Sequence, residues 1–193
     1  NGMSSKTAIE HKEILYLTQI LGLVPYQEYT DDMMKKLPYQ HLVIFTDQDD
    51  DGAHIMGLVL NWLQEFHTPL LKACPDFVLR FATPIVRVKL GKEVHKFFSQ
   101  IEFKNFLGDR TPTHVKYYKG LGTSTSDDAK EYFRDIDNHR ICVRFTGDRS
   151  KSSIVQFFAK DKVKERQKAL TIFDHDSFID YKNDTTFEDF CGV

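Results

Sequence analysis

An apolar run that stops at a dense cluster of acids constrains the fold of this chain more than any other feature. The run "HLVIFT" is followed by "DQDDD", which carries four carboxylates: Asp47, Asp49, Asp50 and Asp51. A short continuous apolar run is typical of a strand buried on both faces in a parallel sheet. After the acids, apolar residues recur at helical spacing from Ile55 to Phe66, with Pro69 beyond. The sequence therefore predicts a strand, an acidic loop and a helix, which form the first half of a βαβ unit.

The acids would lie at the carboxyl end of that strand, where the active groups of open parallel sheets gather. Asp47 and Asp49 are separated by one residue, so a turn can aim both at one cation, and Gly52 permits a close backbone approach. Magnesium takes hard oxygen ligands, usually one or two carboxylates together with substrate phosphate. We therefore predict a magnesium site for phosphodiester chemistry, in which two metal ions can stabilise the attacking and leaving oxygens.

Three other interpretations fit part of the acidic pattern. A calcium-binding helix–loop–helix shares D-x-D-x-D-G, but it needs a bidentate Glu at the twelfth position, where this chain has Leu58. That interpretation fails. A phosphatase with an aspartyl-phosphate intermediate also places D-x-D after a strand, but it usually carries Thr or Val at the position of Asp51. This alternative and a solvated acidic turn that only caps the following helix both stay open on these residues alone.

The rest of the chain contains further helical and strand patterns. A helix is predicted from Glu10 to Leu21, with Gly22 as its stop. Thr125 and Asp128 resemble a capping box that opens another helix. Strands are predicted in "FVLRFATPIVRVKLG", with a bend at its proline, in "HVKYYKGLG" and, by alternation, in residues 141–145, and a mostly polar helix in "KDKVKERQKAL".

The net charge of −2 conceals a strong asymmetry along the chain. Residues 1–79 carry 5 basic and 11 acidic side chains, whereas residues 80–119 carry 9 basic and 3 acidic ones, and residues 120–193 carry 12 and 14. A cationic middle beside an acidic cluster suits a polyanion that is bridged to the acids by metal. Charge alone favours the simpler alternative of an ordinary solvated surface.

The chain shows no sign of membrane insertion or secretion. No apolar run approaches the roughly 20 residues that a membrane helix needs, and no signal peptide is recognisable. Cys74, Cys142 and Cys191 are odd in number, scattered and outside any metal-ligand spacing, which favours reduced, buried thiols. We expect an intracellular protein with no membrane partner. The first residues, "NGMSS", lack an initial Met, and both ends suggest a piece of a larger protein.

Three stretches resemble a known family. "TDQDDDGAHIMGL", "TPIVRV" and above all "YYKGLGTSTSDDAKEYF" look like the eukaryotic-type type IIA DNA topoisomerases, in the family's order and nearly its spacing. The resemblance extends from about Ile9 to Phe190 and includes viral members. A lone D-x-D-x-D-G would be weak, but its combination with YYKGLGTST is highly specific.

The resemblance implies an α/β fold: a Toprim (Rossmann-like) domain whose central, mostly parallel sheet is flanked by helices, plus a short C-terminal α+β extension. Residues 1–138 would form the Toprim domain without its upstream Glu motif. Residues 139–173 would form the extension, and residues 174–193 a linker towards an absent winged-helix domain. The implied parent protein is an ATP-dependent homodimer that cuts both strands of one duplex, passes a second duplex through the break and reseals it.

The resemblance also implies roles for single residues. Asp47 and Asp49 match the family's catalytic magnesium ligands, with Asp51 beside them, and Mn²⁺ or Ca²⁺ can substitute for Mg²⁺. Asp47 would lie nearest the scissile phosphate. Contacts to double-stranded DNA are implied for a set of residues in and near the KGLG turn: His54, Lys116, Lys119, Gly120, Leu121, Gly122, Thr123 and Ser124. ATP would be bound by the parent protein and not by this segment. The expected location is the nucleus for a cellular eukaryotic protein, and the host cytoplasm or nucleus for a viral one.

Some family features are missing from the sequence. No "EG" pair offers the family's upstream Glu, and none of the eight Tyr follows an Arg, as the nucleophile does in the family. Asp127 stands where many relatives carry Lys, which puts one phosphate contact in doubt. The segment alone is therefore not expected to cleave DNA. A non-catalytic interaction module and another Toprim-type nuclease or primase are the competing hypotheses.

Overall fold

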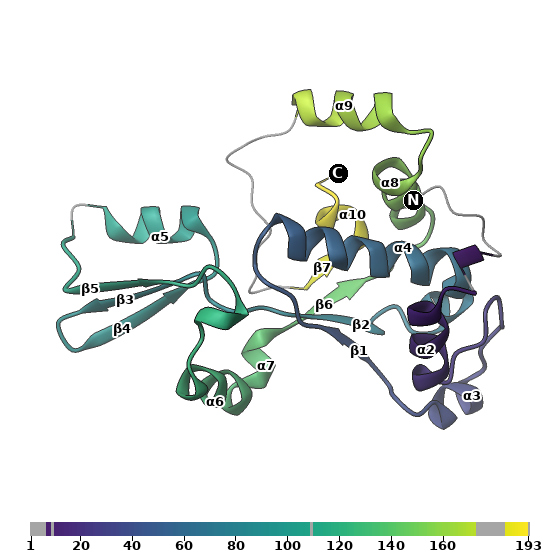
Figure 1. The fold of residues 1–193 in the computed structure, drawn as a ribbon, viewed down its shortest axis with the longest axis horizontal. Coiled ribbons are helices and arrows are strands. Elements are labelled where there is room, and N and C mark those ends of the chain that lie inside the picture. Colours follow the sequence, from purple (N-terminus) through teal and green to yellow (C-terminus); the bar gives the residue numbers. More distant parts are fainter. Residues whose placement is uncertain (1–6, 9, 109, 173–183, 193) are drawn as a thin grey trace.

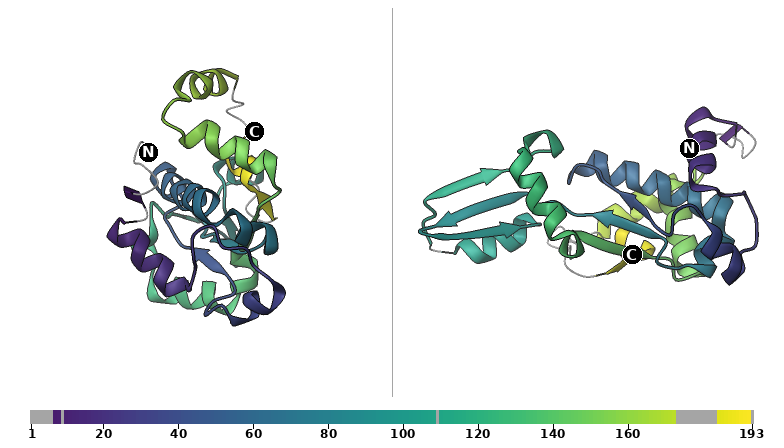
Figure 2. Two further views of the ribbon diagram at one scale, coloured as in Figure 1. Left: turned by 90° about the vertical axis from the view of Figure 1, so that its right-hand side faces the viewer. Right: turned by 90° about the horizontal axis from the view of Figure 1, so that it is seen from below.

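The computed structural model describes residues 7–8, 10–108, 110–172 and 184–192. The strands of these residues form two sheets that lie side by side (Figure 1). The larger sheet has the order β1-β2-β6-β7, and the smaller one has the order β4-β3-β5. Figure 2 shows that the smaller sheet extends away from the larger one, so that the molecule is elongated.

The larger sheet is mixed. Strand β1 (Leu42–Ile44) runs parallel to β2 (Val78–Phe81), which is antiparallel to β6 (Arg140–Arg144), and β6 is parallel to β7 (Thr185–Thr186). Helices flank this sheet (Figure 1). The predicted α/β class with a sheet flanked by helices is therefore confirmed. In β6, three consecutive residues are buried in place of the alternation that the sequence predicted, because this strand lies inside the sheet and is covered on both faces.

The main core lies between the larger sheet and the helices α4 (Asp50–Ala73) and α8 (Asp148–Phe158). The strands contribute Ile44, Val78 and Val143, and the helices contribute a larger set that includes Met56, Leu60, Leu63, Leu70 and Ile154. The buried face of α4 includes Trp62, Leu63 and Phe66 of the predicted apolar spacing, whereas Ile55 and Leu58, which belonged to the same prediction, are exposed. The helix therefore forms because its apolar stripe is buried against the sheet.

Helix α4 is longer than the sequence predicted. It continues past Pro69 to Ala73, and His67 interrupts it with a non-helical backbone (φ −132°). Pro69 thus lies in the first turn after the interruption, where the missing N–H of proline leaves no helical hydrogen bond unmade. A proline in a helical pattern marks a kink here and not the end of the helix.

The smaller sheet is antiparallel and has a core of its own. Strand β3 (Val86–Leu90) lies between β4 (Glu93–Phe97) and β5 (His114–Tyr117), and α5 (Gln100–Leu107) covers one face. The buried residues are Val86, Val88, Phe97 and Phe103. The predicted strand stretch "FVLRFATPIVRVKLG" is therefore two strands, β2 and β3, which belong to different sheets. The sequence did not predict β4, α5 or α8.

Several local predictions are confirmed. Helix α2 (Lys12–Leu21) ends at Gly22, which has the left-handed conformation (φ 66°) that favours glycine. Helix α6 (Ser126–Arg134) begins with the predicted capping box of Thr125 and Asp128. The other helices are α3 (Asp31–Lys36), α7 (Ile136–His139) and α9 (Val163–Ile172), the last of which matches the predicted polar helix.

The C-terminal residues correct the prediction of a linker across residues 174–193. Residues 174–183 lie outside the described residues, but residues 185–190 form β7 and the short helix α10 (Phe187–Phe190). Phe187 is fully buried in the main core, and the Glu188 carboxylate accepts hydrogen bonds from Thr146 Oγ1 (2.5 Å) and Ser150 Oγ (2.7 Å). The segment is held by one buried ring, Phe187, and one hydrogen-bonded carboxylate, Glu188. Two such residues produce no periodic pattern in the sequence, and the segment therefore resembled a linker.

The three cysteines are free thiols. Cys142 is buried as predicted, whereas Cys74 and Cys191 are only half-buried. Among the described residues, no helix has the length and apolar character that crossing a membrane requires.

Candidate functional site

The acids follow β1 and run into the first turn of α4, which contains Asp50 and Asp51, so the order of strand, acids and helix is as the sequence predicted. The strand itself differs from the prediction: β1 lies at the edge of the sheet with Val43 exposed, and it is not buried on both faces. Asp47 is half-buried, whereas Asp49, Asp50 and Asp51 are exposed. Asp49 is the N-cap of α4, and its Oδ1 accepts a hydrogen bond from the Gly52 amide at 2.8 Å. Asp49 therefore caps the helix, which is the role that the alternative interpretation, a solvated acidic turn, assigned to the whole loop.

Gly52 allows the backbone of the loop to pass very close to the helix. A Cβ atom at Gly52 would lie 2.0 Å from the backbone carbonyl oxygen of Asp47. In addition, the Thr46 hydroxyl donates to the Gly52 carbonyl oxygen at 3.2 Å. The predicted close approach of the backbone at Gly52 is thus present. Because position 52 has no side chain, the Asp47 backbone can lie against the first turn of α4.

A buried arginine ties the loop to the neighbouring strand. Arg80 on β2 is 4% exposed, and its Nη2 donates to Gln48 Oε1 at 2.9 Å. Gln48 Nε2 in turn donates to the Phe81 carbonyl oxygen at 3.2 Å. Sequence reasoning counted Arg80 only as one charge of the cationic middle. The signal that could have found it is a charged residue inside the apolar run "FVLRFA", since a buried charge requires a partner.

The KGLG turn, Lys119 to Gly122, closes on the Asp47 carboxylate. The Leu121 amide donates to Asp47 Oδ1 at 2.5 Å, although the two residues are 74 positions apart. A Cβ atom at Gly120 would lie 3.0 Å from Asp47 Oδ2. The turn itself is closed by Thr123, whose hydroxyl donates to the Gly120 carbonyl oxygen at 2.6 Å. The fold therefore brings together the two motifs that were most informative in the sequence.

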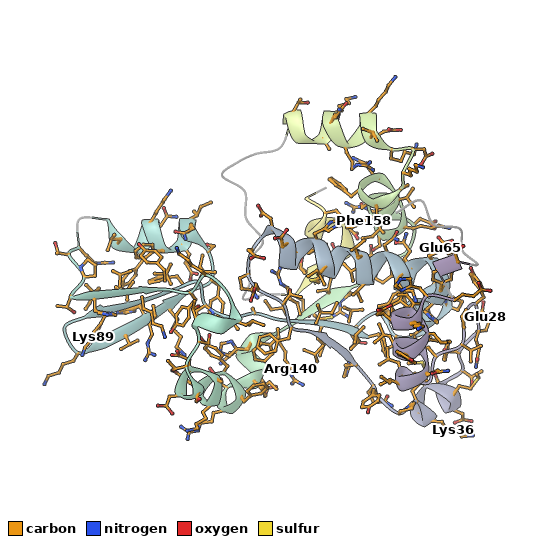
Figure 3. All side chains as sticks on the ribbon, in the orientation of Figure 1. Glu28, Lys36, Glu65, Lys89, Arg140 and Phe158 are labelled. Carbon is orange, nitrogen blue, oxygen red and sulfur yellow. The ribbon has the colours of Figure 1, made fainter. Side chains whose placement is uncertain are left out.

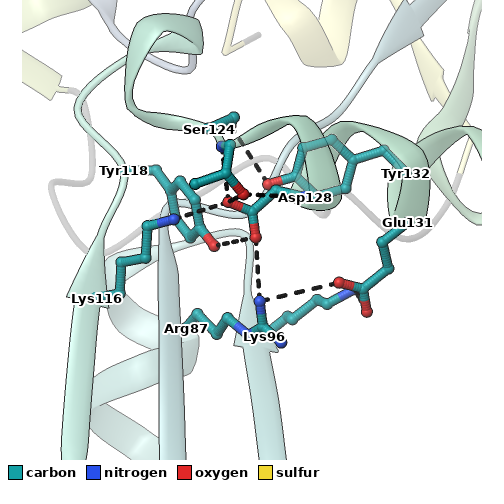
Figure 4. A network of polar contacts seen from close by, with 9 residues as sticks. Arg87, Lys96, Lys116, Tyr118, Ser124, Asp128, Glu131 and Tyr132 are labelled. Atoms are coloured by element: carbon teal, nitrogen blue, oxygen red, sulfur yellow. Dashed lines mark hydrogen bonds and ion pairs between the residues drawn. The ribbon is translucent and has the colours of Figure 1, made fainter.

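A buried carboxylate, Asp128, anchors both sides of this turn (Figure 4). Asp128 is 4% exposed and accepts from Lys116 Nζ at 2.7 Å and from Arg87 Nη1 at 3.0 Å. It also accepts from the Tyr118 hydroxyl at 3.1 Å and from the amide and hydroxyl of Thr125, both at 2.9 Å. Lys116 and Tyr118 precede the turn, and Thr125 follows it, so one side chain connects the two ends.

The donors around Asp128 determine its charge. Burial opposes ionisation of the carboxyl group, but hydrogen bonds from Lys116, Thr125 and Tyr118 outweigh it and hold the pKa of Asp128 well below its usual range. Burial also raises the pKa of the nearby Tyr132 to about 12. Its hydroxyl therefore stays neutral at physiological pH, and it lies 3.5 Å from the Ser124 hydroxyl at the end of the turn.

The residues predicted to contact DNA differ in their surroundings. Lys119, Gly122 and Thr123 are exposed, and Gly120, Leu121 and Ser124 are half-buried. Lys116 differs from the expectation, because its ammonium group faces the buried Asp128 carboxylate (Figure 4). The exposed His54 ring stacks on Phe158 at a centroid distance of 5.9 Å. Phe158 lies on α8, which packs on α4 (Figure 3). The predicted DNA contacts remain predictions.

The cationic middle is less cationic at the surface than its formal charge of +6 suggests. Among the described residues, four of its basic side chains contact acidic or polar side chains, namely Arg80 with Gln48, Arg87 and Lys116 with Asp128, and Lys96 with Glu131. A fifth, Arg110, donates to the Phe106 carbonyl oxygen. Lys89, by contrast, points away from the body at the outer end of the smaller sheet (Figure 3). A count of charges along the sequence therefore overstates the charge that a polyanion would meet.

The carboxylates of the loop fit part of a magnesium site. Within the described residues, no three His, Cys, Asp or Glu side chains are grouped so that they could hold a metal ion, so Asp51 does not complete a three-carboxylate group with Asp47 and Asp49. The hydrogen bonds described above occupy Oδ1 of Asp47 and of Asp49. Magnesium usually takes only one or two carboxylates and otherwise binds water and phosphate. The second oxygens of this pair suit such a partial ligand set.

Comparison with known proteins adds three findings. Residues 81–192 match a family described as the C-terminal associated domain of TOPRIM. The chain is 41% identical to DNA topoisomerase 2 of Plasmodium falciparum over 194 residues, and to human DNA topoisomerase 2-alpha over 178 residues. These alignments cover 97% and 90% of this chain, but only 13% and 11% of the relatives. A crystal structure of the P. falciparum topoisomerase II DNA-binding, cleavage and re-ligation domain superimposes with a TM-score of 0.88 at 40% identity, covering 98% of this chain and 26% of that one.

Proposed function

This chain belongs to the family of C-terminal domains associated with TOPRIM, and from that premise we propose that it is the magnesium-binding Toprim part of a type II DNA topoisomerase. Its resemblance to the eukaryotic-type enzymes is confirmed by the matches to topoisomerases 2. The proposed parent protein is an ATP-dependent homodimer. It makes a transient double-strand break in DNA, passes a second duplex through and reseals the break, in the nucleus of a eukaryotic cell or in the host cell of a virus.

One observation carries the proposal: the Asp47 carboxylate, which follows the carboxyl end of β1, is in contact with the KGLG turn. Asp47 and Asp49 would hold magnesium, with Mn²⁺ or Ca²⁺ as substitutes, and the exposed Asp51 would add to the negative potential. When bound, the cation would neutralise charge on the phosphodiester and stabilise its attacking and leaving oxygens.

The other residues of the site would position the DNA. Lys119 is exposed at the start of the turn, and Thr123 and Ser124 follow at its end. Lysine ammonium groups, hydroxyls and backbone amides are the usual partners of phosphate oxygens, and such contacts place a protein on the duplex without reading its sequence. His54 stands on the second turn of α4, close in sequence to the acids.

The proposed site is incomplete in this segment. The family's Glu from an E-G-D-S-A motif and its nucleophilic Tyr after an Arg do not occur in these 193 residues. The segment by itself should therefore bind magnesium weakly and should not cleave DNA. Those residues and the ATP site belong to other parts of the proposed parent protein.

Magnesium titration of the 193-residue chain tests the metal assignment. We expect Asp47→Asn and Asp49→Asn each to abolish the weak binding, because each variant removes a charged ligand. Asn at position 49 keeps a side-chain acceptor for the cap of α4, so the loop should keep its structure. Asp127→Ala removes an acid that is 92% exposed on α6 and serves as the control. Unchanged affinity in both loop variants, measured by calorimetry, would refute the assignment.

In the intact parent enzyme, Asp47→Asn should remove both cleavage and religation while duplex binding stays nearly normal. The carboxylate would act on the transition state, whereas binding depends mainly on cationic contacts with phosphate. The assay compares relaxation of supercoiled DNA with duplex affinity for the same protein preparation. Relaxation at a rate close to that of the unchanged enzyme would contradict the catalytic role of Asp47.

A further inference from the structure

We propose that the KGLG turn is a positioning element for the Asp47 carboxylate, which it holds with the Leu121 amide and accommodates through the missing side chain of Gly120. This inference rests on the proposed role of Asp47 as a magnesium ligand and adds a role for the turn besides contact with DNA. Gly120 and Leu121 would act through Asp47, as positioning residues, without touching the cation themselves.

The first support is the contact between the turn and the carboxylate. The Leu121 amide lies 2.5 Å from Asp47 Oδ1. A Cβ atom at Gly120 would lie 3.0 Å from Oδ2, 3.1 Å from Cγ and 3.2 Å from Oδ1 of Asp47, and these are its three nearest atoms. The Leu121 amide therefore holds one oxygen of the carboxylate, and the missing side chain of Gly120 leaves the space that the whole carboxylate group needs.

The second support is the reason for a glycine at this position. Gly120 has an extended backbone (φ 170°), which any residue can adopt, so its backbone conformation does not require glycine. What a side chain at position 120 would meet is the Asp47 carboxylate. Gly122, two residues later, has nothing within 4 Å of its Cβ position. The requirement for a missing side chain is thus specific to the glycine that faces Asp47.

The third support is the rigidity of the frame that carries the Leu121 amide. Within the turn, the Thr123 amide donates to the Gly120 carbonyl oxygen at 3.0 Å, and the Ser124 amide donates to that of Leu121 at 3.1 Å. Before the turn, the Tyr118 amide donates to the Ile85 carbonyl oxygen at 2.8 Å. The buried Asp128 joins the two flanks. A donor on such a frame has a fixed position, as groups that orient a metal ligand require.

This arrangement has a definite consequence for a bound cation. The amide engages Oδ1 of Asp47 and thereby orients the carboxylate, so that Oδ2 is presented in one direction. Loss of a group that orients a metal ligand typically lowers metal affinity by about 10- to 100-fold. The effect of a change at Gly120 should therefore appear in magnesium affinity itself, without any DNA in the assay.

The main experiment compares Gly120→Ala with Gly122→Ala in the 193-residue chain, with Mg²⁺ as the probe and NMR chemical shifts as the readout. We expect Gly120→Ala to weaken magnesium binding by about tenfold, because the added methyl group displaces the carboxylate. Gly122→Ala adds a methyl group to the same turn in open space, and we expect unchanged magnesium affinity. Equal affinities for the unchanged chain and for Gly120→Ala would overturn the proposal.

A second measurement isolates the contact from the metal. In the Asp47→Ala background the carboxylate is gone, so Gly120→Ala should no longer lower the melting temperature, whereas it should lower it in the unchanged chain. Exchange of the Leu121 amide hydrogen should also be faster in Asp47→Ala, and this test does not depend on any Gly120 variant folding. Absence of both effects would show that the turn does not hold the carboxylate.

The two proposals fail in different ways. In the first case, Asp47→Asn leaves magnesium affinity unchanged, although Gly120→Ala lowers the melting temperature only when Asp47 is present. The turn then contacts the carboxylate, but the metal assignment is wrong, and so is the positioning role towards magnesium. If magnesium binding requires Asp47 but Gly120→Ala has no effect on it, the proposed function stands and the positioning role of the turn is wrong.

Discussion

Two carboxylates at the KGLG turn, Asp47 and Asp128, have the same chemistry and opposite surroundings. Asp128 is buried and accepts hydrogen bonds from two cations, a phenol, an amide and a hydroxyl. Asp47 is half-buried, and the one hydrogen bond described above comes from a backbone amide. An ionised carboxylate has about four lone-pair sites. The fold uses the full capacity of Asp128, whereas Asp47 keeps capacity for another partner, and this difference separates a structural acid from a candidate ligand.

The largest expected effect is on the structural side of this comparison. Asp128→Ala would leave the Lys116 and Arg87 cations together without their shared partner, and we expect the free energy of unfolding to fall by roughly 3 kcal/mol. Urea unfolding of the 193-residue chain measures this loss. Asp127→Ala is the matched control, because Asp127 is the preceding residue and only pairs at the surface with Lys130.

The outcome bears directly on the proposed division of roles. A loss at Asp128→Ala no larger than at Asp127→Ala would mean that the network is not what holds the turn. Conversely, Asp47→Asn should change stability little, since Asn keeps an oxygen that can accept from the Leu121 amide at this partly exposed site. A loss at Asp47→Asn as large as that at Asp128→Ala would make Asp47 a second structural acid.

A buried histidine adds a pH dependence that must be separated from that of Asp128. Burial lowers the pKa of His67 to about 4 from the usual 6.5. Between these values the unfolded chain binds a proton that the folded chain does not, so stability falls as pH drops through this window, by about 2 kcal/mol between pH 7 and pH 5. Asp128 has a lowered pKa, and its contribution is present above about pH 3.8 and is lost below that.

His67→Leu should therefore flatten the slope of stability against pH between about pH 6.5 and 4 and leave the steeper loss at lower pH. The slope is compared in place of the absolute stability, because the substitution also changes packing around a fully buried ring. A slope in His67→Leu equal to that of the unchanged chain would mean that His67 does not titrate in this window.

The parts of the fold that the sequence predicted are those encoded by neighbouring residues. The strand, acidic loop and helix around Asp47 follow from a continuous apolar run and a 3.6-residue period. The stop at Gly22 and the box of Thr125 and Asp128 follow from turn and cap chemistry. Each of these depends on residues at most a few turns of helix apart, so no knowledge of the partner surface is needed.

The parts that the sequence did not predict depend on distant partners. The strands on either side of Pro84 joined different sheets, because strand pairing is decided by the partners and not by the strand itself. Arg80 and Lys116 counted as surface charges until the fold gave them Gln48 and Asp128. The contact between Leu121 and Asp47 crosses 74 residues and uses a backbone amide, which has no signature in a sequence.

The smallest expected effect concerns two lysines that the sequence placed in one class. Lys119 is exposed at the turn, whereas Lys116 is bound to Asp128, so we expect only Lys119 to face DNA phosphates. In the full DNA-cleavage core, Lys119→Ala should weaken binding about equally on all duplexes and reduce the slope of log affinity against log salt by roughly one unit. Lys116→Ala should leave that slope unchanged and instead lower the free energy of unfolding, because Asp128 loses its shortest ion pair.

Duplex affinities across a salt series, with the free energy of unfolding measured in parallel, separate the two lysines. An unchanged slope for Lys119→Ala would show that the turn meets DNA through its backbone alone, and a reduced slope for Lys116→Ala would show that this lysine leaves Asp128 when DNA binds.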